Sequence, residues 1–411
     1  MGDPTVSVTS TTPTDDDTAG LLTGYPGRMV LLLAFGWLSI LLGRQALPPL
    51  LPTIIEQLRL SPARAGVALT VMMGLYSLLQ YPAGRLSDGL SRTTLLVGSI
   101  GGMLIGFGLL ATVSNYPQLL LGTAFVGLSS AFYFTPSRAM LSDLFVERRG
   151  QAFGLQTTAG MGGGALAAGV AVGALRYATW QAAFLPTMVL LVGVGVLLHR
   201  WSHESYVLSR AAIEFDFRGT VGRLVWRSRI RRLLLMRALV AFTFQGIVGF
   251  LPTFLQIEKG FSTTLASASF ALVFVVGSLM GPPAGRLSDI WPRLRVVLGA
   301  LGVGIAGLIG LLVGASPAIV IGSIIALAAG LASLFPVMGA YFMDLFPDRS
   351  VGGDFGAAKT VYTGLGSIGP TYVGVVAAQQ DYTIAFVGLL GLLVLAVVLL
   401  VTLQPPASDD G

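Results

Sequence analysis

A dozen long apolar runs, separated by short polar breaks, dominate the sequence between Arg28 and Gln404. Each run can cross a bilayer as a helix, since a membrane-spanning helix takes about 20 apolar residues. Only 11% of the residues are charged, so the chain lacks the polar surface of a soluble protein, in which about 25% are charged. The pattern predicts an all-α integral membrane protein with twelve transmembrane helices. The expected spans are residues 29–55, 64–86, 94–113, 117–144, 151–174, 180–199, 233–255, 263–287, 294–315, 317–343, 354–378 and 383–403.

The polar segments predict how the chain is oriented. Residues 1–27 have neither a basic start nor an apolar run, so we expect a disordered tail and no cleavable signal peptide. Lys and Arg residues gather in alternate loops, and Arg237 is counted with them near the start of the seventh helix. Because basic loops remain cytoplasmic, both termini, including residues 405–411, are expected in the cytoplasm and the protein in the plasma membrane. The basic, aromatic-containing linker of residues 201–232 is expected to lie on anionic lipid headgroups.

The two halves that flank this linker repeat one another. The segment Gly-Arg-Leu-Ser-Asp occurs at residues 84–88 and again, letter for letter, at residues 285–289. Such colinear matches predict two homologous six-helix bundles, residues 28–200 and 233–404, related by pseudo-twofold symmetry. Further matches at nearly the same offset pair Gln45 with Gln245, Pro52 with Pro252 and Pro136 with Pro336.

These features resemble the major facilitator superfamily of secondary transporters over residues 28 to 404. The most specific marker is the loop between the second and third helices, where Gly84, Asp88 and Arg92 match the family pattern Gly-x-x-x-Asp-Arg/Lys-x-Gly-Arg-Arg/Lys. The match is partial, and Trp291-Pro292 interrupts the second copy. The resemblance implies alternating access and a central cavity lined by the first, fourth, seventh and tenth helices.

The loop motif has an expected role in gating. Asp88 can pair with Arg92 at the cytoplasmic end of the second helix, and Arg92 can reach Asp143 at the end of the fourth. The resemblance implies that such contacts close the cytoplasmic side of the outward-open state. The alternative is a solvated loop whose surface ion pairs contribute at most about 1 kcal/mol. The candidate gating residues are Gly84, Asp88, Arg92, Asp143, Gly285, Asp289, Arg293 and Asp344.

Three cations fall within predicted spans, whereas none of the 19 acidic residues lies in the middle of one. The position of each of these three cations needs an explanation, because burying a cation in the membrane costs at least about 2.5 to 3.5 kcal/mol. Arg44 is deepest, up to roughly 22 Å from the cytoplasmic end of its helix, and is expected to bind an anion. The alternative is a structural arginine satisfied by glutamines or carbonyls. Arg138 and Lys359 are shallower and can also reach the headgroups.

Other residues are expected beside these cations. The pattern Arg44-x-x-Leu47, with Pro52 following, resembles the first helix of the family's organic anion and phosphate transporters. Tyr362 shares a helix face with Lys359, because residues three apart on a helix are neighbours. The candidate substrate-binding residues are Arg44, Gln45, Tyr133, Arg138, Gln245, Lys359 and Tyr362.

The sequence as a whole predicts a secondary active transporter of a small anionic organic solute, driven by an ion gradient or by exchange. No P-loop signature occurs, so ATP is not the expected energy source. With no cysteine and only two histidines, no metal site, cofactor or enzyme activity is expected. The expected partners are the solute, a coupling ion or counter-solute and membrane lipid, without nucleic acid, and the protein is expected to be a monomer.

Three alternatives remain open at this point. An exporter of hydrophobic or cationic compounds is favoured by the Gly-rich stretch from Gly154 to Gly173, although no acidic residue lies mid-span to hold a cation. An intramembrane enzyme would need clustered acid-base or nucleophilic residues that the spans lack. A non-transporting sensor on the same scaffold is the third.

Overall fold

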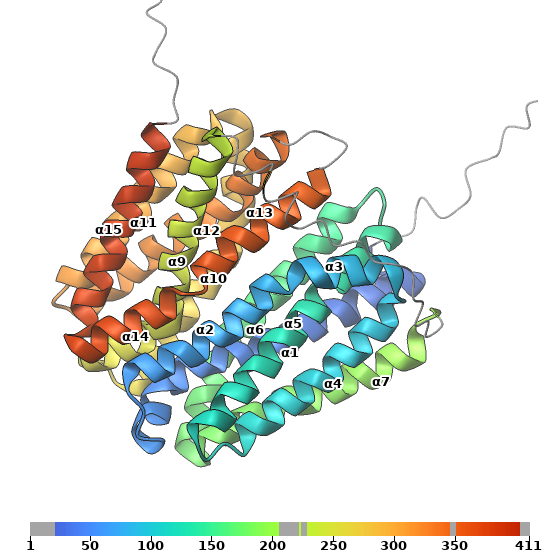
Figure 1. The fold of residues 1–411 in the computed structure, drawn as a ribbon, viewed down its shortest axis with the longest axis horizontal. Coiled ribbons are helices and arrows are strands. Elements are labelled where there is room, and N and C mark those ends of the chain that lie inside the picture. Colours follow the sequence, from blue (N-terminus) through green and yellow to red (C-terminus); the bar gives the residue numbers. More distant parts are fainter. Residues whose placement is uncertain (1–20, 205–221, 223–227, 346–350, 403–411) are drawn as a thin grey trace, which may run out of the picture.

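The computed structural model describes residues 21–204, 222, 228–345 and 351–402, and in this part of the chain all regular secondary structure is helical (Figure 1). Eleven helices among the described residues are long and apolar enough to cross a membrane. The first bundle consists of α1 (Gly24–Gln57), α2 (Pro62–Leu78), α3 (Gln80–Gly89), α4 (Arg92–Ala111), α5 (Tyr116–Leu144), α6 (Arg149–Tyr177), a 3-10 turn (Trp180–Phe184) and α7 (Leu185–Trp201). The second consists of α9 (Ser228–Ile257), α10 (Thr263–Ile290), α11 (Arg293–Val313), α12 (Pro317–Leu345), α13 (Val351–Gly366), α14 (Gly369–Gln379) and α15 (Tyr382–Val401).

Two of the twelve expected spans are broken helices. The second span divides into α2 and α3 around Leu79, shortly before Pro82. The eleventh divides into α13 and α14, and Pro370 lies in the first turn of α14. A proline lacks the N–H group that would continue the helical hydrogen bonding, so each break falls just before one. The pair α13 and α14 therefore supplies the twelfth expected span.

Most expected helix boundaries agree with the structure to within a few residues, and two differences matter. Helix α1 begins at Gly24, inside the tail expected for residues 1–27. Helix α9 begins at Ser228, inside the expected linker, instead of at residue 233. The longer α9 places Arg237 nine residues from the helix start, or about 14 Å along the axis. Residues 1–20 and most of the linker lie outside the described residues.

Polar loop residues define where several helices begin. The side chains of Ser61, Ser91, Asn115, Ser262 and Asp381 each accept a hydrogen bond from a backbone N–H in the first turn of the next helix. Such caps satisfy donors that have no partner within the helix. The short polar breaks in the sequence therefore both end one span and start the next.

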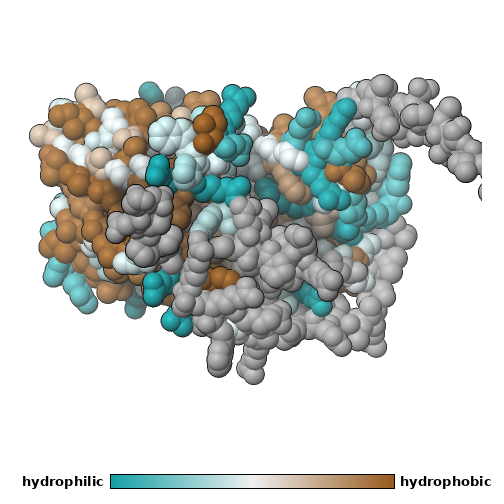
Figure 2. Space-filling model, turned by 90° about the horizontal axis from the view of Figure 1, so that it is seen from above, coloured by the Kyte–Doolittle hydropathy of each residue, from teal (hydrophilic) through white to brown (hydrophobic). Residues whose placement is uncertain are grey.

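The two bundles lie side by side, with the first in blue to green and the second in yellow to red in Figure 1. Helix α2 packs along α14 and α13, α6 packs along α10, and α1 contacts α9. We call the end of the molecule at which α7 ends and α9 begins the linker end, and the opposite end the far end. Viewed from above, hydrophilic residues gather along the boundary between the two bundles, whereas hydrophobic residues cover much of the second bundle (Figure 2).

Backbone-to-backbone contacts join the bundles at the far end. A Cβ atom on Gly66 of α2 would lie 2.4 Å from the carbonyl oxygen of Pro370, and one on Gly374 would lie 2.3 Å from that of Pro62. Next to the Gly66–Pro370 contact, the Thr371 hydroxyl lies 2.7 Å from that of Thr70. The missing side chains let α2 and α14 approach this closely. We call this contact of α2 with α14 the far-end seam.

Candidate functional site

Arg44 lies inside the molecule on α1, with 3% of its surface exposed. Its Nη2 lies 3.3 Å from the sulfur of Met73, and its guanidinium carbon lies 4.4 Å from the centroid of the Tyr76 ring. Its Nε is buried without a hydrogen-bond partner. The structural alternative, in which glutamines or carbonyls satisfy this arginine, does not describe these contacts. A thioether and an aromatic face leave the guanidinium with unused donor capacity.

An aromatic cluster, made of Trp37, Tyr76 and Phe134, lies beside Arg44, which contacts its Tyr76 ring. The Phe134 ring centroid lies 4.7 Å from that of Trp37 and 6.1 Å from that of Tyr76. These three rings come from α1, α2 and α5. Aromatic faces attract cations through their quadrupole but carry no net charge. The cluster can therefore hold cations close together without neutralising them.

Arg138 and Lys359 contact the same ring of this cluster. The guanidinium carbon of Arg138 lies 4.7 Å from the Phe134 centroid, and the Lys359 ammonium lies 4.9 Å from it. Arg138 also donates a hydrogen bond to the Thr157 hydroxyl at 2.8 Å and lies over Phe153. Because Arg138 belongs to α5 and Lys359 to α13, this ring contacts a cation from each bundle.

Arg237, counted from the sequence among the cytoplasmic basic residues near the start of the seventh helix, is buried like Arg44, whereas Arg138 and Lys359 are half-buried. It is 3% exposed and lies within the candidate membrane span Ile230–Ile257. Its guanidinium carbon lies 4.7 Å from the Phe335 ring centroid and 4.8 Å from that of Tyr362. Its Nη1 is buried without a hydrogen-bond partner. The sequence did not mark Arg237 as a buried cation because the expected helix began at residue 233, which would leave Arg237 near the membrane surface.

The four cations Arg44, Arg138, Arg237 and Lys359 form what we call the cation cluster. Phe134 contacts both Arg138 and Lys359, Tyr76 of the aromatic cluster contacts Arg44, and Arg237 contacts Tyr362, three residues from Lys359 on α13. Within the described residues the one ion pair joins Arg92 to Asp143, so no described acid pairs with the cluster. Desolvating the buried Arg44 and Arg237 costs several kcal/mol that no described counter-charge offsets. The positive charge of the cluster is therefore uncompensated among the described residues.

The remaining candidate binding residues differ in position. Gln45 and Gln245 each have a buried side-chain oxygen without a partner, and Gln245 donates to the carbonyl of Thr363 at 3.3 Å. Tyr362 contacts Arg237 and therefore borders the cluster. Tyr133 is fully buried, and its hydroxyl donates to the Leu33 carbonyl at 3.1 Å. That bond packs α5 against α1, so Tyr133 is left out of the candidate site.

Sequence reasoning missed the rings of the site. Trp37, Tyr76 and Phe134 resemble ordinary core residues in an apolar sequence, and nothing in their local pattern distinguishes them from Phe107 or Phe184. One signal was present for Phe134, which precedes Arg138 by four residues and therefore shares its helix face. The contacts of Lys359 and Arg44 with these rings join distant segments, which a single sequence does not reveal.

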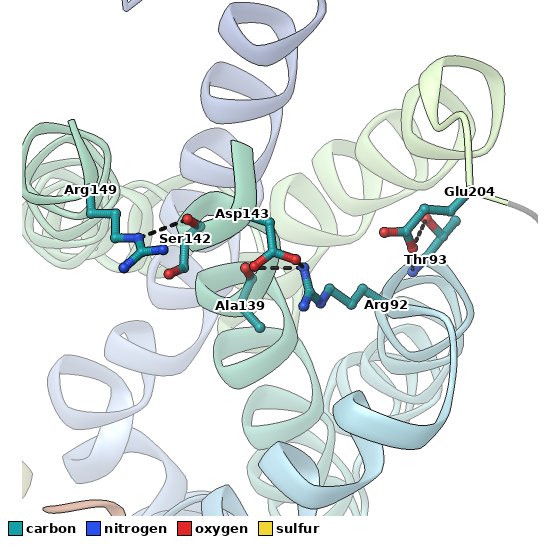
Figure 3. Close-up of polar contacts among 7 residues, drawn as sticks. All are labelled: Arg92, Thr93, Ala139, Ser142, Asp143, Arg149 and Glu204. Carbon is teal, nitrogen blue, oxygen red and sulfur yellow. Dashed lines mark hydrogen bonds and ion pairs between the residues drawn. The ribbon is translucent and has the colours of Figure 1, made fainter. Parts of the chain in front are cut away.

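A second polar site lies at the linker end of the first bundle (Figure 3). The expected ion pair between Arg92 and Asp143 is present, and the same guanidinium nitrogen of Arg92 donates to the Ala139 carbonyl at 3.2 Å. Arg149 donates to the Ser142 carbonyl at 2.9 Å. Asp143 is 61% exposed, so water weakens the pair. The start of α4 is thus joined to the end of α5, while the gating role stays a prediction.

Glu204, which follows α7, joins this site from the other side (Figure 3). One of its carboxylate oxygens accepts hydrogen bonds from the Thr93 backbone N–H at 3.1 Å and from the Thr93 hydroxyl at 3.3 Å. His203, which precedes Glu204 in the sequence, stacks on Tyr25 with ring centroids 4.2 Å apart. A carboxylate at a helix N-terminus also interacts favourably with the helix dipole. The beginning of the linker is therefore fastened to the loop that carries the gating motif. A polar cavity of about 490 Å³ is lined by Ser87, Leu90, Ser91, Arg92, Asp143, His203 and Glu204.

The other candidate gating residues can be placed on their helices, but the described contacts do not bear on gating. Asp289 is exposed at the end of α10, and Arg293 begins α11. Gly84 and Gly285 lie within α3 and α10. The side chains of Asp88 and Asp344 lie outside the described part of the structure, so the expected contacts of these two acids stay predictions.

The family model described as Major Facilitator Superfamily matches residues 33–317 and, in a second match, residues 233–410. The second match covers the second bundle alone, in keeping with the internal repeat. None of the curated proteins compared with the chain matches it.

Several solved structures of transporters are similar to the chain in fold. A bacterial homolog of the human lysosomal transporter Spinster, inward-facing and unoccupied, has a TM-score of 0.77 at 15% identity and covers 94% of this chain and 100% of its own. A mutant of the nucleoside transporter NupG has a TM-score of 0.76 at 15% identity, covering 92% and 100%. A D-xylose-proton symporter has a TM-score of 0.74 at 16% identity, covering 94% and 99%. At these identities the likeness concerns the fold.

Proposed function

The chain belongs to the major facilitator superfamily, and from this premise we propose that it is a secondary active transporter of a small anionic organic solute, working by alternating access. The observation that carries the proposal is the cation cluster. Arg44 and Arg138 come from the first bundle, and Arg237 and Lys359 from the second. A solute held among them would therefore contact both bundles at once.

The charge of the cluster favours an anion over the rival solutes. A bound carboxylate or phosphate would supply the missing counter-charge and accept hydrogen bonds from the unpartnered Arg44 Nε and Arg237 Nη1. A cation would meet four like charges and no described acid. The aromatic cluster adds apolar surface beside the charges, which suits an organic anion that carries a hydrocarbon or ring portion.

The two ends of the molecule suit alternating access. The far-end seam closes one end in this conformation, while Arg138, Lys359 and Arg237 lie nearer the linker end of their helices. We place the linker end in the cytoplasm and the protein in the plasma membrane, because most of the basic residues are at that end. In the opposite state, the far-end seam would open and the linker end would close around the Arg92–Asp143 pair.

The driving force follows from the same charges. An empty site would carry its uncompensated cations through the change of state, whereas a loaded site would carry them neutralised. This difference favours exchange of one anion for another, or co-transport with an ion, over movement of the empty carrier. One chain supplies both halves of the site, so the monomer is the proposed transport unit.

Uptake into proteoliposomes tests the proposal. The purified protein would be given radiolabelled mono- and dicarboxylates and organic phosphates, with amines and hydrophobic cations as the rival class, and with or without anions loaded inside. We expect uptake of at least one anion, stimulated by internal anion, and its loss in Arg44→Gln. Arg286→Gln is the matched control, because Arg286 is an exposed arginine on α10. Full anion uptake by Arg44→Gln, or transport of cations alone, would overturn the assignment.

A further inference from the structure

An apolar groove opens between α10 and α11 on the outer side of the second bundle, and none of its lining residues belongs to the cation cluster. It has a volume of about 500 Å³. Its floor is α12, and its walls are the linker-end halves of α10 and α11. The lining residues are Met280, Pro283, Ala284, Leu287, Trp291, Arg295, Val296, Gly299, Ala300, Val303, Ala329, Gly330 and Ser333.

The groove exists because two helices pack on a third without packing on each other. Helix α12 is in close contact with both α11 and α10, whereas α10 and α11 barely touch. Small residues keep the space between them open, and a Cβ atom on Gly299 would meet no atom within 4 Å. Leu287 and Val303 are exposed on its two walls. In a membrane-spanning protein, such an outward-facing apolar groove lies against the hydrocarbon of the bilayer.

The mouth of the groove carries residues suited to the membrane surface. Trp291, at the end of α10, is 55% exposed, and Arg295 lies in the first turn of α11. The Arg295 guanidinium is exposed, and no ion pair in the described part of the chain includes it. Tryptophan side chains favour the headgroup level, and arginines there attract anionic headgroups. This is also where Trp291-Pro292 interrupts the second copy of the gating motif.

We propose that this groove binds one acyl chain of an anionic phospholipid, with the headgroup phosphate held by Arg295. The apolar walls exclude water from the acyl chain, and Arg295, the one cation among the residues that line the groove, complements the phosphate. A guanidinium can donate two parallel hydrogen bonds to a phosphate, which fixes the headgroup as well as attracting it. The site is separate from the proposed solute site and does not depend on the identity of the solute.

Native mass spectrometry of the delipidated full-length protein tests the lipid site. The protein would be titrated with phosphatidylglycerol and, in parallel, with phosphatidylethanolamine of the same acyl chains. We expect one phosphatidylglycerol to bind more tightly than the rest and more tightly than any phosphatidylethanolamine. Equal retention of the two lipids would overturn the role of the headgroup phosphate.

Two pairs of variants separate the groove from general lipid contact. Arg295→Gln is expected to weaken the tight phosphatidylglycerol by about fivefold, and Gly299→Leu, which fills the groove, is expected to remove it. The controls are Arg286→Gln and Gly302→Leu, since Gly302 is also exposed on α11 with open space around it but does not line the groove. Thermal unfolding of each variant checks that it is folded. Undiminished binding by folded Gly299→Leu would refute the proposal.

Discussion

The ammonium of Lys359 lies 4.9 Å from the centroid of the Phe134 ring, and these two residues belong to opposite bundles. Arg138 contacts the same ring from its own bundle. A cation–π contact contributes about 0.5 to 2 kcal/mol, less than a buried ion pair can, and it leaves the charge unneutralised. Phe134 therefore holds cations of both bundles near one point without occupying the place that an anion would take.

Replacing Phe134 tests whether the ring positions these cations. Phe134→Leu removes the aromatic face, and we expect the apparent KM for the transported anion to rise roughly tenfold, since about 1 to 2 kcal/mol of cation–π attraction is lost. Phe134→Tyr keeps the ring and should stay within a few-fold of the parent. Phe125→Leu, on the exposed face of the same helix, is the control for packing. Equal KM values for Phe134→Leu and Phe125→Leu would argue against a positioning role.

We expect the buried charge of Arg44 to lower the stability of the ligand-free protein while it serves to bind the anion. Replacing a buried charge by an apolar residue of similar length is often neutral or stabilising by about 1 to 4 kcal/mol. We therefore expect Arg44→Met to raise the apparent melting temperature of the ligand-free protein and to abolish its further rise when the transported anion is added. Differential scanning fluorimetry measures both. A structural arginine would give the opposite result, a lower melting temperature in the variant.

The sequence predicted the membrane class, the span positions and the repeat because these depend on runs of many residues. It identified Arg44, Arg138 and Lys359 because a cation within an apolar run is conspicuous. Arg237 was not recognised as a buried cation because its depth depends on where α9 begins, and hydropathy locates a span better than its ends. Trp37, Tyr76 and Phe134 could not be identified, since their role depends on which cation packs on which ring. Glu204 was overlooked because its partner, Thr93, is more than a hundred residues away.

Breaking the linker-end ion pair should affect transport more than stability. Asp143→Asn removes a surface pair worth at most about 1 kcal/mol, so we expect little change in melting temperature and a several-fold lower rate of anion uptake. The charge-reversed double variant, Arg92→Asp with Asp143→Arg, should recover part of that rate, because the pair is restored in the other direction. No recovery, with both single variants impaired, would indicate that each residue acts through other contacts.

A disulfide across the far-end seam should stop transport reversibly. The hydroxyls of Thr70 and Thr371 lie 2.7 Å apart, and the chain contains no cysteine. In the double variant Thr70→Cys with Thr371→Cys, we expect an oxidant to block uptake and a thiol reductant to restore it, because the seam must open in each cycle. The two single variants control for the loss of each hydroxyl. Full activity of a cross-linked sample, with the bond verified by mass spectrometry, would contradict alternating access through this end.

The contacts at the two ends of the protein differ in how strongly dissolved salt affects them. The far-end seam consists of glycine and proline backbone in direct contact, with one pair of hydroxyls beside them, and dissolved ions do not screen dispersion forces. At the linker end, Arg92 and Asp143 are joined by charge in an exposed position, where ions screen the attraction over about 8 Å at physiological ionic strength. Ionic strength is therefore expected to weaken the ion pair at one end of the molecule and to leave the backbone contacts at the other end almost untouched.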